Sequence, residues 1–229
     1  MTIESAAMEQ PLVLVLATRN AGKTAEIRDL LKDFPIEIRN LDDFGPIPEI
    51  EEDGTTFEEN AYKKAHFAAR VLGFPALADD SGLVVDALDG APGVYSARYA
   101  GQNASDAERC TKLLAAMAHQ TERSAAFECV ISIAVPEGPA LTYEARCEGQ
   151  ITCQPTGENG FGYDPVFFYP PLAKTFAEMT MAEKSTVSHR GLALRELQSE
   201  FDKVLIWIQQ HMPVVIRSGC IAGNDSGTV

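Results

Sequence analysis

A short apolar run, residues 12–17, leads directly into a polar, glycine-containing loop near the start of the chain. The run has the length of a buried strand, and TRNAGK at 18–23 follows it. Apolar side chains then recur at the spacing of one buried helix face, and a proline ends the pattern: Ile27, Leu30, Leu31, Phe34 and Pro35. A buried strand that passes into a helix is typical of α/β proteins, so this feature restricts the fold class strongly.

The alternation of strands and helices continues along the chain. The pattern predicts helices over 56–73, from 105 and after 188, and strands over 36–41, 76–78, 83–88, 127–135 and 141–151. We therefore expect an α/β fold with a mixed, elongated central sheet flanked by helices, and two lobes with the active-site cleft between them. Residues 11–211 would form this single two-lobed domain, between a loose N-terminal extension (1–10) and a flexible C-terminal tail (212–229).

Charge and cysteine spacing exclude several classes of function. The formal net charge is -14, whereas a protein that binds long nucleic acids normally carries a basic surface. The apolar run at 12–17 is too short to cross a bilayer, and the first ten residues lack the basic start of a signal peptide. The five cysteines form no CxxC pair, which argues against a zinc site or a disulfide framework. We expect a cytoplasmic protein with no membrane or nucleic acid polymer as partner.

The loop at 18–23 has the features of an anion-binding site. A helix that begins after a small, polar loop presents unpaired backbone N–H groups, to which Thr18 and Asn20 add side-chain donors and Lys23 adds a positive charge. Together they could hold a triphosphate. The GxxxxGK spacing of a Walker A loop is missing, and an ordinary helix cap with a solvated lysine is the alternative interpretation.

Two acidic segments suit a hard divalent cation. Asp79 and Asp80 follow apolar residues 76–78, and buried carboxylates are costly unless a metal or another cation neutralises them. Glu49, Glu51, Glu52 and Asp53 crowd an earlier loop, where a solvated face is the alternative. Magnesium takes one or two carboxylates and shares phosphate oxygens of its substrate, and a carboxylate here could also accept a proton from an attacking water. On an extended strand, Asp79 and Asp80 would point to opposite faces.

The remaining polar segments indicate a ligand with a planar group. Asn60 and Lys64 lie one turn apart on a predicted helix. Glycines 157, 160 and 162 permit a close backbone approach, and Phe161 could lie against a base. Lys184, His189 and Arg190 gather at the start of an apolar helix, where basic residues oppose the helix dipole and so need another reason to be present.

These segments, in this order, resemble one family, the inosine/xanthosine triphosphate pyrophosphatases, which act on noncanonical purine nucleotides. The resemblance covers residues 12–209 and is closest to the bacterial branch. It rests on TRNAGK at 18–23, EEDGTTFEENA at 51–61, LADDSGLVVDALDGAPGVYSARYAG at 77–101, GFGYDPVFF at 160–168 and EKSTVSHRG at 183–191.

The resemblance implies a homodimeric, magnesium-dependent hydrolase that converts ITP, dITP and XTP to the monophosphate and pyrophosphate, and so removes deaminated purines from the nucleotide pool. It implies Asp80 as proton acceptor, with Lys64 and Asn20 beside the triphosphate, and Glu51 and Asp80 as magnesium ligands. The substrate-binding residues that it implies are Thr18, Arg19, Asn20, Ala21, Gly22, Lys23, Ser81, Phe161, Gly162, Tyr163, Asp164, Lys184, His189 and Arg190. Arg19 departs from the glycine that is frequent at this position.

Selectivity has a physical basis in hydrogen bonding. Hypoxanthine and xanthine carry an acceptor oxygen at position 6, where adenine carries an amino donor, and Arg190 and the backbone N–H groups of loop 160–164 would offer donors only. Two alternatives remain open from the sequence. One is a pyrophosphatase for other nucleotides, such as modified pyrimidines, and the other is a nucleotide-binding regulator without turnover, which the acidic set around Asp80 disfavours.

Overall fold

The computed structural model of the chain describes residues 11–48 and 50–212. The predicted extension over 1–10 and all but the first residue of the predicted tail over 212–229 lie outside the described residues, as does Glu49. Among the described residues, none of the helices has the length and hydropathy needed to cross a membrane.

A single mixed sheet forms the centre of the molecule. Its strand order is β2-β1-β3-β4-β5-β6-β7, and only the β1–β2 and β1–β3 pairings are parallel. The strands are β1 (Leu12–Leu16), β2 (Ile36–Asn40), β3 (Ala76–Val85), β4 (Ser124–Ala134), β5 (Ala140–Ile151), β6 (Phe167–Tyr169) and β7 (Lys174–Thr175). The predicted α/β class, the mixed sheet and the long hairpin are therefore confirmed.

The described part of the chain forms five α-helices around the sheet. They are α1 (Ala21–Leu31), α2 (Phe57–Leu72), α3 (Asp106–Ala116), α4 (Met181–Val187) and α5 (His189–His211). Short 3-10 helices lie at Leu41–Phe44, Asp86–Leu88, Gly93–Arg98, Asp164–Val166, Pro170–Leu172 and Phe176–Glu178. Thr56 and Ser105 accept hydrogen bonds from backbone N–H groups at the starts of α2 and α3, as the capping signals predict.

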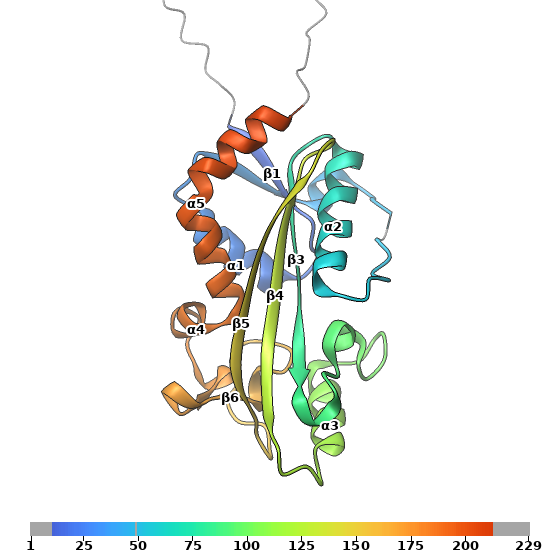
Figure 1. Ribbon diagram of the computed structural model, residues 1–229, viewed down its shortest axis with the longest axis vertical. Coiled ribbons are helices and arrows are strands. Elements are labelled where there is room, and N and C mark those ends of the chain that lie inside the picture. Colours follow the sequence, from blue (N-terminus) through green and yellow to red (C-terminus); the bar gives the residue numbers. More distant parts are fainter. Residues whose placement is uncertain (1–10, 49, 213–229) are drawn as a thin grey trace, which may run out of the picture.

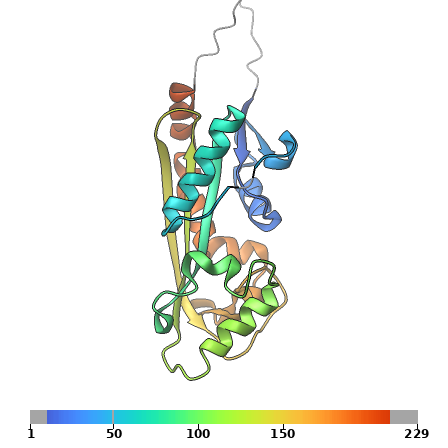
Figure 2. The same ribbon diagram turned by 90° about the vertical axis from the view of Figure 1, so that its right-hand side faces the viewer.

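The helices divide the molecule into two lobes that share the long strands β3, β4 and β5 (Figures 1 and 2). In the first lobe, α5 packs on β4 and β5 on one face of the sheet, and α2 packs on β3 and β4 on the other. In the second lobe, α3 packs near the far ends of the same strands, over a separate core that includes Leu83, Phe127 and Phe167. Since β3 runs through both lobes, residues at its middle lie at their junction.

Strand β3 corrects one detail of the sequence prediction. Its two predicted pieces, 76–78 and 83–88, form one strand that ends at Val85, and the last three predicted residues form a 3-10 helix. Polar residues 79–82 look like a break, but they pair with β4 across the ladder from Ile131 to Glu128. Buried polar side chains are tolerated inside a strand where other groups neutralise them.

The junction of α4 and α5 places three predicted site residues. Ser188 caps α5, because its hydroxyl accepts the N–H of Gly191 at 3.1 Å. A Cβ atom on residue 191 would collide with the backbone carbonyl of Ser185, so only glycine allows the two helices to approach this closely. The close junction holds His189 and Arg190 in the first turn of α5, beside Lys184 of α4.

Candidate active site

A cavity of about 460 Å³ lies where the two lobes meet. Its walls come from the loop after β1, from α2 and β3, and from α3, loop 160–164 and the α4–α5 junction. The predicted site residues that line it are Thr18, Arg19, Asn20, Lys23, Lys64, Asp80, Ser81, Phe161, Gly162, Tyr163, Asp164, Lys184, His189 and Arg190. Ala21, Gly22 and Glu51 do not line it.

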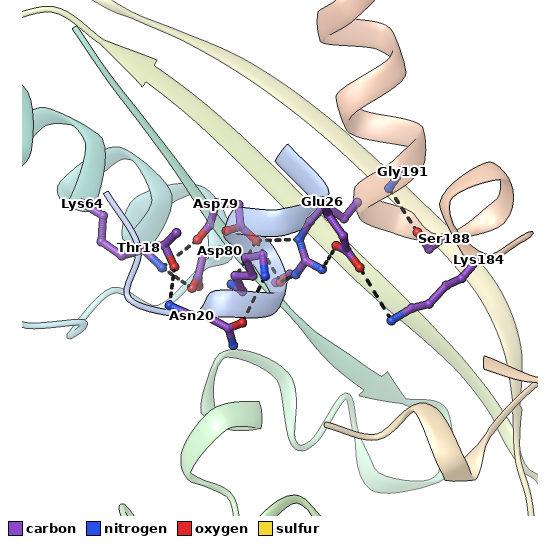
Figure 3. Close-up of polar contacts among 12 residues, drawn as sticks. Thr18, Asn20, Glu26, Lys64, Asp79, Asp80, Lys184, Ser188 and Gly191 are labelled. Carbon is purple, nitrogen blue, oxygen red and sulfur yellow. Dashed lines mark hydrogen bonds and ion pairs between the residues drawn. The ribbon is translucent and has the colours of Figure 1, made fainter. Parts of the chain in front are cut away.

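The loop after β1 is shaped by its own side chains. Asn20 is the cap of α1 and accepts the backbone N–H of Lys23 at 3.1 Å, while its own N–H donates to the Thr18 hydroxyl at 3.2 Å (Figure 3). A Cβ atom on Gly22 would lie 3.0 Å from the Phe161 ring. Glycine at this position therefore lets the Phe161 ring approach the first turn of α1. The start of α1 thus faces the cavity with the donors that an anion needs.

Asp79 is the most deeply buried carboxylate in this region, with 1% exposure. Its Oδ2 lies 2.9 Å from Lys23 Nζ and 3.1 Å from Arg190 Nε, and it accepts the Ser81 hydroxyl at 3.3 Å (Figure 3). Burial by itself would raise the pKa of Asp79, but the charges of Lys23 and Arg190 hold it well below its usual range. Asp79 therefore stays ionised, and its ion pairs with Lys23 and Arg190 connect α1 and α5 to the middle of β3.

Asp80 points to the other face of β3, as the alternation of an extended strand predicts. Its Oδ1 accepts Lys64 Nζ at 2.7 Å, and its Oδ2 accepts the Asn60 amide at 3.4 Å. Lys64 also donates to the backbone carbonyl of Asp79 at 2.9 Å. Burial raises the pKa of Asp80, and Lys64 opposes that rise only in part. Asp80 is a cavity-lining carboxylate held in place by two side chains of one helix.

The two neighbouring glutamates, Glu51 and Glu52, line different hollows of the surface. Glu51 is exposed and lines a separate hollow beside Tyr62 and Lys63. Glu52 lines the cavity, and its Oε1 lies 3.3 Å from Lys64 Nζ. Arg98 donates to the backbone carbonyl of Glu52 at 3.0 Å, which fixes this part of the loop.

The residues present fit a magnesium ion. Glu52 and Asp80 converge on one ammonium group, that of Lys64, so two carboxylates already share a position suited to positive charge. In residues 11–48 and 50–212, no group of three or more metal-binding side chains gathers. Magnesium is typically held by one or two carboxylates together with phosphate oxygens of the substrate, so a pair of carboxylates meets its needs.

Loop 160–164 and α4 form the opposite end of the cavity. Lys184 Nζ lies 2.6 Å from Asp164 Oδ2 and 4.7 Å from the centre of the Phe161 ring. The same Asp164 oxygen accepts the N–H of Phe161 at 2.9 Å. Burial raises the pKa of Asp164, with Lys184 opposing the rise. A planar aromatic surface thus lies beside a buried ion pair, an arrangement suited to a heterocyclic base.

Arg190 links the two ends of the cavity. It is 2% exposed and donates to Asp79, to Glu26 at 2.7 Å and to the Ser81 hydroxyl at 2.8 Å. Two donors that the selectivity hypothesis assigned to the base, the N–H groups of Phe161 and Gly162, already bond to Asp164 and Asp106. The hypothesis therefore needs donors other than these two amides.

His189 is buried and neutral. Its ring stacks on Phe127 of β4 at 4.6 Å between centroids, and its Nδ1 has no hydrogen-bond partner. Burial, together with the charges of Arg190 and Lys184, holds the pKa of His189 well below its ordinary value. The ring faces the cavity as a flat, uncharged surface.

Several residues of this site escaped the sequence reasoning. Glu26 lies one helical turn after Lys23, so the spacing of three residues could have revealed it as a companion on the same face of α1. Glu52 could have been separated from Glu51 only by knowing the loop conformation. Asp106 and Phe127 carry no local signal, because the site residues that they contact, Gly162 and His189, lie more than fifty residues away along the chain.

Comparison with known proteins gives one consistent result. A model of the Ham1 family matches residues 14–200. The dITP/XTP pyrophosphatase of Syntrophobacter fumaroxidans is 66% identical over 93% of this chain and 94% of its own length. That of Desulfotalea psychrophila is 58% identical over 87% of this chain and 90% of its own. The solved structure of a HAM1 protein from Coxiella burnetii has a TM-score of 0.79 and 47% identity, covering 84% of this chain and 99% of that one.

The neutral state of His189 predicts how stability depends on pH. The unfolded chain binds a proton at this histidine below about pH 6.5, whereas the folded chain does not, so stability falls as the pH drops. We expect this histidine to add a slope approaching about 1.4 kcal/mol per pH unit below about pH 6. Urea unfolding between pH 5 and 8 measures it, with His189→Phe as the matched variant that keeps a ring against Phe127. Parallel curves for the two proteins would show that folding does not lower the pKa of His189.

Proposed function

The chain belongs to the Ham1 family, and we propose that it hydrolyses ITP, dITP and XTP to the nucleoside monophosphate and pyrophosphate. It is thus an enzyme, a hydrolase of a phosphoric anhydride bond, and it removes deaminated purines from the nucleotide pool. The observation that carries the proposal is the charge cluster at the cavity wall. Lys23, Lys64 and Arg190 line the cavity with Asp80, and Lys23 and Arg190 pair with the buried Asp79 beside it.

The phosphate end of the site lies at the start of α1. Thr18 and Lys23, which line the cavity, bind the triphosphate, and Asn20 keeps the turn in shape. The family resemblance adds the backbone N–H groups of Ala21 and Gly22, although these two residues do not line the cavity. Arg19, which donates to the Ile47 carbonyl at 3.2 Å, borders the same opening. These local donors explain how a protein with a net charge of -14 binds a polyanion.

The reaction breaks the bond between the α-phosphorus and the oxygen that bridges to the β-phosphate. A water oxygen bonds to the α-phosphorus, pyrophosphate leaves, and the proton of the water passes to Asp80. Lys64 orients Asp80 and lies beside the phosphates. Asp80 would hold magnesium together with a glutamate of the 51–52 pair, and the bound ion would neutralise charge on the phosphate oxygens.

The base end of the site lies between loop 160–164 and α4. Phe161 offers its face to the purine, while Ser81 and the ion pair of Lys184 with Asp164 supply polar contacts. Gly162 and Tyr163 complete the loop, and His189 adds an uncharged ring. Arg190 remains the candidate for the purine oxygen at position 6, because it lines the cavity and its guanidinium carbon lies 5.7 Å from the centre of the Phe161 ring.

The family resemblance extends the proposal beyond the site. We propose that residues 11–211 act as one two-lobed domain, that the chain forms a homodimer, and that it works in the cytoplasm on free nucleotides. The acidic net charge supports free nucleotides over nucleic acid polymers.

Product analysis after incubation with ITP and magnesium tests the reaction. We expect pyrophosphate and IMP, with slower release from ATP, GTP and modified pyrimidine triphosphates. Asp80→Asn should lower kcat by about 100-fold or more, since it removes the proton acceptor. Asp86→Asn, an exposed change after β3, is the matched control and should keep the wild-type rate. Orthophosphate as product, or equal rates for ITP and ATP, would contradict the proposal.

Magnesium titration of the rate tests which glutamate holds the ion. The resemblance implies Glu51, whereas Glu52 is the one that lines the cavity beside Lys64. We expect Glu52→Gln to raise the magnesium concentration for half-maximal rate by about tenfold. Losses of this size in metal affinity follow even the removal of a group that only supports a metal ligand. Glu51→Gln should raise it less, because its side chain faces the neighbouring hollow. The reverse order would assign the ligand to Glu51.

A further inference from the structure

The first turn of α3 holds the middle of loop 160–164. Asp106 Oδ2 accepts the backbone N–H of Gly162 at 2.7 Å, although the two residues lie 56 positions apart. Cys110, one turn later on α3, donates its thiol to the carbonyl of Gly162 at 3.4 Å. Both polar backbone groups of Gly162 are therefore held by the same helix.

Gly162 is one of two glycines in this loop with a positive φ, and it is the one that α3 holds. Its φ of +63° is a conformation that favours glycine, and it lies between Phe161 and Tyr163. Glycine is also the residue with the most conformational freedom to lose, so the loop has no stiffness of its own at this point. Inside the loop, Asp164 accepts the N–H of Phe161 at 2.9 Å and donates its own N–H to the Phe161 carbonyl at 3.3 Å. The contacts from α3 add to this by holding the next residue, Gly162.

Asp106 is itself held in position by Arg109. The guanidinium forms an ion pair with the other carboxylate oxygen of Asp106. It also donates to the backbone carbonyls of Ala97 at 2.9 Å and Ala104 at 2.7 Å. Both Asp106 and Arg109 line the cavity, so the contact lies at the site itself.

The start of α3 does not depend on Asp106. Ser105 accepts the N–H of Glu108 at 3.2 Å, and the Glu108 carboxylate accepts the N–H of Ser105 at 2.8 Å. This reciprocal capping box already satisfies the helix end. One oxygen of the Asp106 carboxylate pairs with Arg109 of the same helix, and the other reaches the loop that carries the aromatic ring.

We propose that Asp106 is a positioning residue for base recognition, an inference that rests on the proposed hydrolysis of purine triphosphates. Its carboxylate fixes Gly162, and Gly162 fixes Phe161 against the cavity in the orientation that accepts a purine. Asp106 touches neither the phosphate loop after β1 nor the pair of Asp80 and Lys64. It therefore governs affinity for the nucleoside end of the substrate and leaves the chemical step unchanged.

The test separates the two ends of the site. Asp106→Ala should raise KM for ITP by about tenfold, the effect of losing one charge-assisted hydrogen bond. The kcat and the inhibition constant of pyrophosphate, which binds only the phosphate end, should stay within about twofold. Asp106→Asn should restore most of the affinity, because the amide oxygen can still accept the Gly162 N–H. In the Asp106→Ala protein, hydrogen exchange at the Gly162 amide should accelerate.

Two controls make the outcome decisive. Glu108→Gln weakens the capping box of α3 without touching Gly162, and it should leave KM for ITP unchanged. If Asp106→Ala does not fold, Asp106→Ser replaces it, since serine suits a helix start and is too short to reach Gly162. An unchanged KM in the folded variant would overturn the inference. So would equal losses of ITP and pyrophosphate affinity, or an asparagine variant as impaired as the alanine one.

The two proposals fail in different ways. If the wild-type protein releases no pyrophosphate from ITP, the proposed function is wrong, and hydrogen exchange at Gly162 still reports whether Asp106 holds the loop. If the wild-type protein hydrolyses ITP and Asp106→Ala has the same KM, only the role of Asp106 is wrong.

Discussion

The ion pairs of Asp79 are the interaction on which the rest of the site depends. A carboxylate with 1% exposure is costly unless cations neutralise it, and Lys23 and Arg190 do so from opposite ends of the chain. Lys23 belongs to α1, the helix that we propose to bind phosphate, and Arg190 belongs to α5, which we propose to border the base. One buried charge at the middle of β3 thus sets the distance between the two ends of the cavity.

Because β3 is one continuous strand, the neighbouring residues Asp79 and Asp80 have different roles. Neighbouring residues on a strand face opposite sides, so Asp79 meets α1 and α5 while Asp80 meets α2. Asp79 organises the cations, and Asp80 lines the cavity where water and magnesium would act. The same strand reaches the second lobe, whose loop 160–164 is held in turn by α3. Both ends of the site are therefore held in place by elements that pack on the sheet.

The sequence predicted what local patterns encode. Strand and helix spacing predicted the α/β class correctly. Most of the loop at 18–23, Lys64 and Asp80 line one cavity, and their roles in a common site stay a prediction. The polar residues 79–82 were misread as a break in a strand, because their neutralising partners are distant. The choice between Glu51 and Glu52 depends on the direction of a loop, and Asp106 depends on a contact 56 residues away. Neither the choice between the two glutamates nor the contact of Asp106 could be predicted from the spacing of residues in the sequence.

A double-mutant cycle on Asp79 and Lys23 tests most directly the claim that this ion pair holds the site together. The free energy of unfolding is measured for the wild type, Asp79→Asn, Lys23→Met and the double variant. If the pair joins α1 to β3 as described, the two substitutions should couple by about 1 kcal/mol or more, as residues in one buried ion-pair network do. Effects that add within about 0.3 kcal/mol would contradict the account.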